Sequence, residues 1–421
     1  MSGSPVRKDA VSETGLVQGQ ITDESVALMR ERIGYPNPTL RVGILDQPWH
    51  SHVNADALRQ YAIAIGDANP IYHQPDLAKR SAWGGQIAPP GFEMSMGYKR
   101  NAQMPDPERE KATSKALRGV QLFNSGNENF YWRPLQIGDS LSKAEWVESV
   151  VLKESEFAGR SALVTNGMMY WDQDENVAIT GGNWFVHAER KKRSDKSKDK
   201  YATLEPAKYT DEDLAKIDAA YEAEYIRGPD TLYFEDVEPG MKLPQMVRGP
   251  LTVTDQINLY MGVGWLTYGN PPHKLAYENR KKLRGFYSKN QNGAWDTIQR
   301  VHWDPELAET VGVRMTYDIG PNRWVMVSNY CTNFAGDDGF VHYLRTEYRS
   351  FNYVGDTTWI DGEVTAARVD EEKGPLIELK ILGINQRGTE NIRGAATILL
   401  PSRKHGPVKM PKAPPMTKHR S

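Results

Sequence analysis

The sequence contains one cysteine, Cys331, among its 421 residues. A single thiol excludes an internal disulfide and a cysteine-rich zinc site, and it is typical of a protein from a reducing compartment. We expect Cys331 to be an inert thiol buried in the core. No segment approaches the ~18 consecutive apolar residues that a membrane-spanning helix requires. Because the polar N-terminal segment also lacks the apolar core of a signal peptide, the predicted location is cytoplasmic.

The sequence also lacks an excess of charge of either sign. It has 52 basic and 54 acidic residues, a formal net charge of −2 and 39% hydrophobic residues. This balance is typical of a globular protein and gives no overall indication of binding to nucleic acid or to an anionic membrane. The length allows two or three domains.

A charged segment divides the chain into two halves. Residues 189–200 hold seven Lys or Arg residues and no apolar one, and a short helix is predicted over residues 211–224. The predicted organisation is a lead-in with a short helix (1–39), a first unit (40–190), a linker (191–230), a second unit (231–402) and a flexible tail (403–421).

The two halves resemble each other. RPLQIGD, ending at Asp139, and RSFNYVGD, ending at Asp356, are each followed by an alternating run and then by two strand-like runs joined by a polar turn. The offset between Gly138 and Gly355 is 217 residues. In the second half, GDDG at 336–339 predicts a hairpin turn between two further strands, VSNYCTNFA and FVHYLRTEY.

A helix is predicted upstream of these strands in both halves. Asn54 is the expected N-cap in the first half and Thr254 in the second, an offset of 200 residues. Pro75 and Pro305 then correspond with an offset of 230, because the second half carries an insertion of roughly thirty residues at 268–293. Each half is therefore predicted to be an α+β unit, and the two units to pair as an internal pseudo-dimer.

The stretch Asp67-x-Asn69-Pro-Ile-Tyr72-His73 places a carboxylate, an amide and an imidazole in one turn after the first helix. A carboxylate beside an imidazole can move a proton near neutral pH, which suggests proton removal from one carbon with loss or addition of water at the next. A capped turn with a structural histidine is the alternative interpretation.

The motif GDANPI is followed by an aromatic residue or histidine, by a proline with Asp or Glu, and by a Gly-rich segment that ends in IAPP. This pattern resembles the MaoC-like family of (R)-specific enoyl-thioester hydratases and 3-hydroxyacyl-thioester dehydratases. The resemblance includes RPLQIGD and covers roughly residues 40–190 and 230–402. It implies a double hot-dog fold, in which each unit wraps an antiparallel sheet around a central helix.

The resemblance also implies which residues react. The family's histidine follows Asn-Pro-Ile directly, a position that Tyr72 holds in the first half and His302 in the second. We therefore expect His302 to be the catalytic histidine, with Asp296 as its partner. The reverse assignment, in which Asp67 reacts with His73 beside it, stays open.

Negative charge that grows on a thioester carbonyl must be held by preorganised donors such as backbone amides. This chemistry needs no metal and no other cofactor. The residues expected to bind the substrate are Asn69, Tyr72, His73, Gly84, Gly85, Val311 and Gly312.

The predicted function is that of a hydro-lyase acting on an acyl thioester of coenzyme A or of a carrier protein. Several tryptophans near the predicted site, among them Trp83, Trp132, Trp295 and Trp303, suggest a bulky acyl group. A non-catalytic thioester-binding or partner subunit is the rival hypothesis, and a thioesterase on the same fold is a weaker one. The sequence leaves open whether the pseudo-dimer pairs again as a homodimer.

Overall fold

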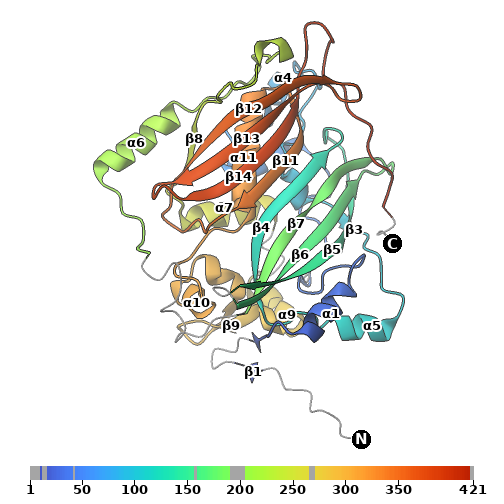
Figure 1. The fold of residues 1–421 in the computed structure, drawn as a ribbon, viewed down its shortest axis with the longest axis vertical. Helices are drawn as coiled ribbons and strands as arrows, with labels where there is room; N and C mark the ends of the chain where they lie inside the picture. The colour runs from blue at the N-terminus through green and yellow to red at the C-terminus, as the bar shows by residue number, and fades with distance from the viewer. Residues whose placement is uncertain are drawn as a thin grey trace, which may run out of the picture.

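The computed structural model describes residues 10–11, 17–40, 43–155, 159–189, 204–264 and 271–417. One ten-stranded sheet runs through the molecule, with helices α7 and α11 behind it in the view of Figure 1. In order across the sheet the strands are β3 (Tyr98–Lys99), β5 (Ser142–Ser155), β6 (Gly159–Trp171), β7 (Val177–Ala188), β4 (Gln121–Tyr131), β11 (Phe340–Tyr348), β14 (Glu390–Leu399), β13 (Gly374–Asn385), β12 (Thr358–Asp370) and β8 (Met246–Arg248).

The two halves of the chain share this sheet equally, and they meet where β4 pairs with β11. That pairing is antiparallel, with Phe130 opposite Tyr343 and Gly126 opposite Glu347. The strand-turn-strand runs predicted in both halves are the hairpins β6–β7 and β13–β14. The internal repeat and the double hot-dog architecture are therefore confirmed.

Helix α11 (Pro321–Ala335) is the central helix of the second half, and all of its residues are buried. The prediction of a strand over VSNYCTNFA was wrong, and GDDG joins this helix to β11 instead of closing a hairpin. The physical reason is that a helix buried on every side has no polar face, so its valines and aromatic residues give only a strand-like propensity. Cys331 lies on this helix and is fully buried, as expected.

The first half has a much shorter element where α11 stands in the second. Its counterpart is the single turn η1 (Phe92–Ser95), which follows two prolines and Gly91. The remaining helices are α1 (Asp23–Arg30), α2 (Ala55–Ile65), α3 (Pro70–His73), α4 (Pro75–Ala78), α5 (Pro107–Thr113), α6 (Asp211–Glu222), η3 (Phe234–Asp236), α7 (Val253–Val263), α9 (His273–Lys282), η4 (Arg284–Phe286), η5 (Ile298–His302) and α10 (Pro305–Thr310).

Helices α2 and α7 are the predicted pair upstream of the strands, and they pack against each other. Asn54 caps α2 by accepting a hydrogen bond from Ala57 N–H, as predicted. The N-cap of α7 is Thr252, which forms a capping box with Asp255, so the assignment to Thr254 was wrong and the offset is 198. Thr252 has Asp255 three residues later, which is the spacing of a capping box, whereas Thr254 has Ile257 at that position, so the sequence pattern itself favours Thr252.

The insertion of the second half is described from residue 271 onward. It forms α9 and β9 (Tyr287–Lys289), which pairs antiparallel with β10 (Trp295–Thr297) just after the insertion. A further two-stranded pair joins β1 (Ala10–Val11) and β2 (Val17–Gln18).

The C-terminal segment was expected to be a flexible tail, but residues 403–417 pack on the body of the protein. Val408 and Met410 contact the main core, and Ala413 and Met416 contact a cluster on the first half's strands. Their apolar side chains, spaced between prolines and lysines, explain why the segment lies on the sheet. None of the described helices is both long and apolar enough to cross a membrane.

Candidate active site

The Asp-x-Asn-Pro stretch forms a tightly capped turn at the end of α2. The helix stops at Gly66, whose positive φ of 71° allows the chain to turn. Asp67 Oδ1 accepts a hydrogen bond from Asn69 N–H (2.9 Å), and Asn69 Oδ1 accepts one from Ile71 N–H (3.3 Å). Pro70 begins α3. The motif residues therefore fix one another in place.

Tyr72 and His302 stand at corresponding places in the two halves, each anchored by a buried glutamine. Gln86 Nε2 donates to Tyr72 O (3.2 Å), and Gln256 Nε2 donates to His302 O (2.8 Å). The two glutamines come from different elements, the segment after the motif turn and helix α7, so the correspondence of Tyr72 and His302 rests on their offset of 230 residues.

His73 turns back toward the preceding helix. Its Nε2 donates to the main-chain oxygen of Asp67 (2.7 Å), and not to the Asp67 carboxylate. The ring is partly exposed and is not among the side chains that line the cavity described next. His73 therefore stabilises the turn, as the alternative interpretation of the sequence proposed.

A cavity lies between the two halves beside this turn, with a volume of about 40 Å³. In the first half, the lining residues come from the motif turn, the APPGFE segment and the end of β4. In the second half, they come from the C-terminal end of α11 and the start of β11. The lining residues used below are Asn69, Tyr72, Glu93, Tyr131, Thr332 and Phe340.

The cavity is small and enclosed by both halves. Its volume holds a few water molecules, at ~10–15 Å³ each on this measure, whereas sites for organic ligands usually offer ~300–1,000 Å³. An acyl chain therefore requires the cavity to widen. None of the tryptophans that suggested a bulky substrate lines this cavity as described.

Asp67 is 2% exposed and does not line the cavity itself, but its carboxylate accepts a hydrogen bond from Asn69, which does. Burial raises the pKa of its carboxyl group to about 6. The Asn69 N–H and the nearby Arg248, Asn329 and His73 side chains oppose that shift, in the order given. Arg248 and Asn329 belong to the second half, so the electrostatics of this turn depend on the pairing of the two units.

Glu93 lines the cavity and was missed by the sequence analysis. It is 1% exposed, and burial raises the pKa of its carboxyl group. A glutamate inside the largely apolar run IAPPGFEMSM was the available signal, since a charged residue is rarely buried without a partner.

His302 in the second half is 9% exposed and lies apart from this cavity. Its Nδ1 donates to Tyr317 O (2.9 Å), which leaves Nε2 as the unprotonated nitrogen. Burial lowers the pKa of the imidazole to about 4, with the hydrogen bond to Tyr317 opposing the shift. The ring is therefore neutral at pH 7 and a weak base.

The structure does not bring Asp296 to His302. Asp296 lies on β10, where Oδ1 accepts from Thr297 N–H (2.7 Å) and Oδ2 is 3.5 Å from Asn290 Nδ2. No hydrogen bond joins Asp296 to His302 among the described residues, so the predicted dyad is not formed. Asp296 directly follows the insertion, and its backbone pairs with Ser288 of the inserted strand β9.

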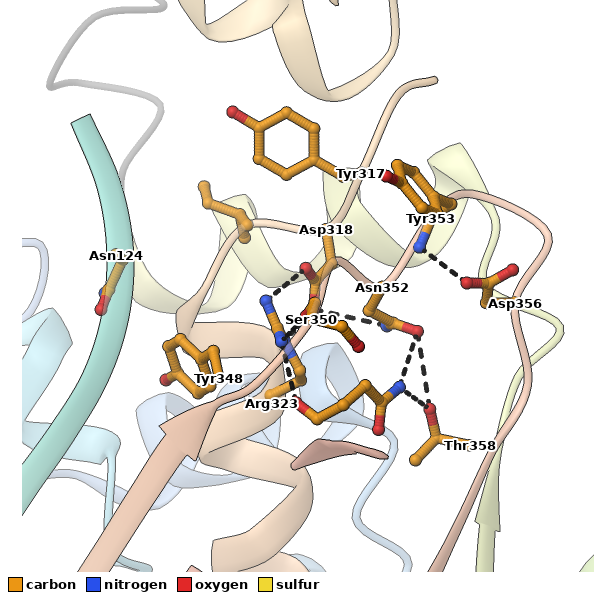
Figure 2. Close-up of polar contacts among 12 residues, drawn as sticks. Asn124, Tyr317, Asp318, Arg323, Tyr348, Ser350, Asn352, Tyr353, Asp356 and Thr358 are labelled. Carbon is orange, nitrogen blue, oxygen red and sulfur yellow. Dashed lines mark hydrogen bonds and ion pairs between the residues drawn. The ribbon is translucent and has the colours of Figure 1, made fainter. Parts of the chain in front are cut away.

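A buried ion pair fills the equivalent place in the second half. Arg323 Nε and Nη2 donate to Asp318 Oδ2 and Oδ1 (2.8 and 3.1 Å), and Arg323 Nη1 donates to Ser350 O (2.8 Å). Figure 2 shows this pair at the start of α11, with Asn352 donating to Asp318 from the side (3.3 Å). The ion pair neutralises both charges, although burial raises the pKa of the Asp318 carboxyl group to about 6, with Arg323 opposing the shift.

Gly320 precedes α11 in this cluster, and two side chains cover it. A Cβ atom at Gly320 would lie 2.9 Å from Asn124 Cβ and 3.0 Å from the Tyr348 ring. Asn124 comes from β4 of the first half, the strand that passes beside the cluster in Figure 2. The second half therefore has a closed, ion-paired interior where the first half has a cavity.

The four other expected substrate-binding residues lie away from the cavity lining. Gly84 and Gly85 are in an exposed loop whose neighbour Trp83 donates from Nε1 to Asp337 O (2.8 Å). Val311 and Gly312 follow α10, and Val311 belongs to a separate apolar cluster with Tyr353. The structure assigns none of these four to the cavity.

Sequence comparisons place the first half among known families. Residues 41–180 match the family model of the FAS1-like dehydratase domain region. A UPF0336 protein of Streptomyces avermitilis is 31% identical over 131 residues, which are 30% of this chain and 81% of that protein. A probable enoyl-CoA hydratase alpha subunit of Thermomonospora curvata is 25% identical over 161 residues, which are 37% of this chain and 50% of that protein.

The structural comparison extends over both halves. A solved structure described as a MaoC-like dehydratase superposes with a TM-score of 0.55 at 17% identity, covering 88% of this chain and 99% of that one. At this identity the likeness shows the fold alone.

Proposed function

Because this chain belongs to the MaoC-like hot-dog family, we propose that it is a hydro-lyase that adds water to a 2-enoyl thioester and removes it from a 3-hydroxyacyl thioester. The proposed substrates are thioesters of coenzyme A or of a carrier protein. The observation that carries the proposal is the cavity between the halves, which Asn69 and Tyr72 of the motif turn line directly.

The proposed site is the first half's turn, and not the His302–Asp296 pair. The second half's interior is filled by the Asp318–Arg323 ion pair, and His302 and Asp296 do not meet. In the first half the motif turn and the cavity occur together, next to Asp67, whose carboxyl group has a pKa of about 6. The pKa of the Asp318 carboxyl group is also raised to about 6, but that group is ion-paired with Arg323. Titratable groups with shifted pKa values at a cavity are typical of sites of proton transfer.

The uncharged side chains of the turn, the Tyr72 phenol and the Asn69 amide, can donate hydrogen bonds to a thioester carbonyl. Burial and the neighbouring Asp67 carboxylate raise the pKa of the Tyr72 phenol well above its usual value, so this group stays protonated and can donate a hydrogen bond. Asn69 adds an amide at the cavity wall. Donors held in place toward a carbonyl oxygen stabilise the charge that develops there when the α-carbon loses its proton.

The rival proposal is a non-catalytic subunit that binds a thioester or a catalytic partner. Two observations favour it: Tyr72 occupies the family's histidine position, and the cavity is small. A direct assay separates the two. The purified protein is mixed with crotonyl-CoA and with longer 2-enoyl-CoA esters, and the enoyl absorbance and free thiol are followed together.

We expect loss of the enoyl absorbance without release of thiol. Release of thiol would instead indicate a thioesterase, and binding without any reaction would support the partner role. The variant Asp67→Asn should lower kcat/KM at least ~10-fold, because it changes the charge behind the turn, whereas His302→Gln should stay within about 3-fold of the parent. The opposite ranking of the two variants would return the site to the second half.

A further inference from the structure

Glu93 is a buried carboxyl group that lies outside the motif and faces the cavity. It sits in η1, the turn that opens the first half's short central element. Both of its oxygens are engaged. Oε2 accepts from Gly91 N–H (2.7 Å), and Oε1 accepts from Asn129 Nδ2 (2.8 Å) and from Tyr131 OH (3.0 Å). Three donors aimed at one carboxylate hold it in a fixed orientation at the cavity wall.

The internal repeat identifies the residue that corresponds to Glu93. The bridges Ile87–Gln136 and Tyr317–Tyr353 are equivalent, because Gln136 N–H and Tyr353 N–H bond the corresponding aspartates Asp139 and Asp356. The offset between Ile87 and Tyr317 is 230 residues, the same as between Pro75 and Pro305. Position 93 in the first half therefore corresponds to position 323 in the second.

The partner of Glu93 has a counterpart as well. Tyr131 pairs with Ile179 on β7, and Tyr348 pairs with Ile392 on β14. Tyr131 donates to Glu93, and the guanidinium of Arg323 lies over the Tyr348 ring, 4.3 Å from its centroid.

The two halves thus carry opposite charges at one and the same place. In the second half Arg323 is neutralised by Asp318, but position 88, which corresponds to Asp318, is Ala88. The carboxylate of Glu93 consequently has hydrogen-bond donors but no ion-pair partner among the described residues. An unpaired acid kept at a buried cavity costs stability, which a merely structural role would not require.

We propose that Glu93 is the residue that carries the proton in the hydratase reaction, with Asp67 as a positioning residue behind the turn. This inference rests on the proposed function. In dehydration, the Glu93 carboxylate takes the proton from C2 of a 3-hydroxyacyl thioester and the C2–C3 double bond forms. The C3–O bond breaks, and the same proton passes from Glu93 to the departing hydroxyl group, which leaves as water. Hydration follows the reverse path.

Asn129 can support both states of this carboxyl group. Its Nδ2 donates to the ionised form, and its Oδ1 is buried without a hydrogen-bond partner among the described residues. Rotation of the amide by half a turn would present Oδ1 as an acceptor for the protonated acid. The other titratable groups that face Glu93 are the phenols of Tyr61 on α2, Tyr131 on β4 and Tyr170 on β6.

The test compares Glu93→Gln with a matched control, Glu128→Gln, on crotonyl-CoA. Glu128 lies on the same strand as Asn129 and forms an ion pair with Arg345 away from the cavity lining. We expect Glu93→Gln to lower kcat by roughly 10²- to 10⁴-fold, with KM changed by less than about 3-fold, and Glu128→Gln to keep parental kinetics. Thermal unfolding of each variant checks that it is folded.

Tyr131→Phe gives a second, independent measurement. The Tyr131 hydroxyl stabilises the ionised form of Glu93, so its loss should move the acidic limb of the kcat/KM profile to higher pH. Full activity of folded Glu93→Gln, or an unmoved profile in Tyr131→Phe, would overturn the role of Glu93 while the hydratase function stands. A parent protein that hydrates none of the enoyl-CoA esters would overturn the proposed function and, with it, this role.

Discussion

Gly262 of α7 faces Ala64 of α2 so closely that a Cβ atom at Gly262 would lie 2.5 Å from Ala64 Cβ. This contact joins corresponding helices of the two halves, as the β4–β11 pairing joins their strands. The close approach requires glycine at this point, because any side chain would force the helices apart.

Gly262→Ala is therefore expected to destabilise the protein by ~1–3 kcal/mol, the usual cost of overpacking. The direction is informative, since glycine-to-alanine changes inside an unobstructed helix normally stabilise by up to ~1 kcal/mol. Urea unfolding followed by circular dichroism measures the change. Gly285→Ala is the control, because a Cβ atom added at Gly285 would have no neighbour within 4 Å, and it should stay within ~0.5 kcal/mol of the parent.

Asp67 should make the stability of the protein depend on pH in a direction unusual for a carboxyl group. Its pKa is raised from 3.8 to about 6 in the folded state, so folding takes up a proton between these values. The protonated Asp67 carboxyl group makes its full contribution to the free energy of unfolding below pH ~4. This contribution is lost as the pH rises through 6, which lowers the free energy of unfolding by roughly 3 kcal/mol.

Asp67→Asn removes that ionisation. The quantity to compare is the free energy of unfolding of the variant minus that of the parent. This difference should be more favourable to the variant at pH 7.5 than at pH 4, by up to ~3 kcal/mol. Unfolding curves at the two pH values measure this directly. An identical difference at both would show that Asp67 ionises normally in the folded protein.

The Asp318–Arg323 pair is expected to be structural. Asp318→Asn leaves the Arg323 charge buried without its counter-ion, and this should cost ~3–5 kcal/mol. The surface pair Arg368–Asp370 provides the control: because solvent screens this pair, Asp370→Asn should leave the unfolding midpoint close to that of the parent. The kcat of the folded fraction of Asp318→Asn should equal that of the parent. A selective loss of kcat would indicate that the second half takes part in the reaction.

The sequence predicted the fold well because the features that define it are local and repeated. The Gly-Asp turns at Asp139 and Asp356, the alternating strands and the capped α2 helix all have short-range patterns. The exception was α11, whose complete burial removes the amphipathic pattern and leaves residues of high strand propensity.

The site was predicted less well, since its decisive relationships are long-range. Position and residue type suggested His302 and Asp296, but burial, the β9–β10 pairing and the Asp318–Arg323 pair separate them from any described cavity. Glu93 has no motif around it. Its place at the cavity follows from the hydrogen bonds with Asn129 and Tyr131, which lie more than thirty residues away in the chain.

The central claim is that an acyl thioester reacts in the cavity between the halves, beside the first half's turn. A crystal structure with a non-hydrolysable thioether analogue of 3-hydroxybutyryl-CoA tests it most directly. The account predicts that the acyl group widens this cavity and lies between Tyr72, Glu93 and Phe340, with its C2 and C3 atoms facing the Glu93 carboxylate. An acyl group bound instead beside His302, with the Asp318–Arg323 pair displaced, would contradict it.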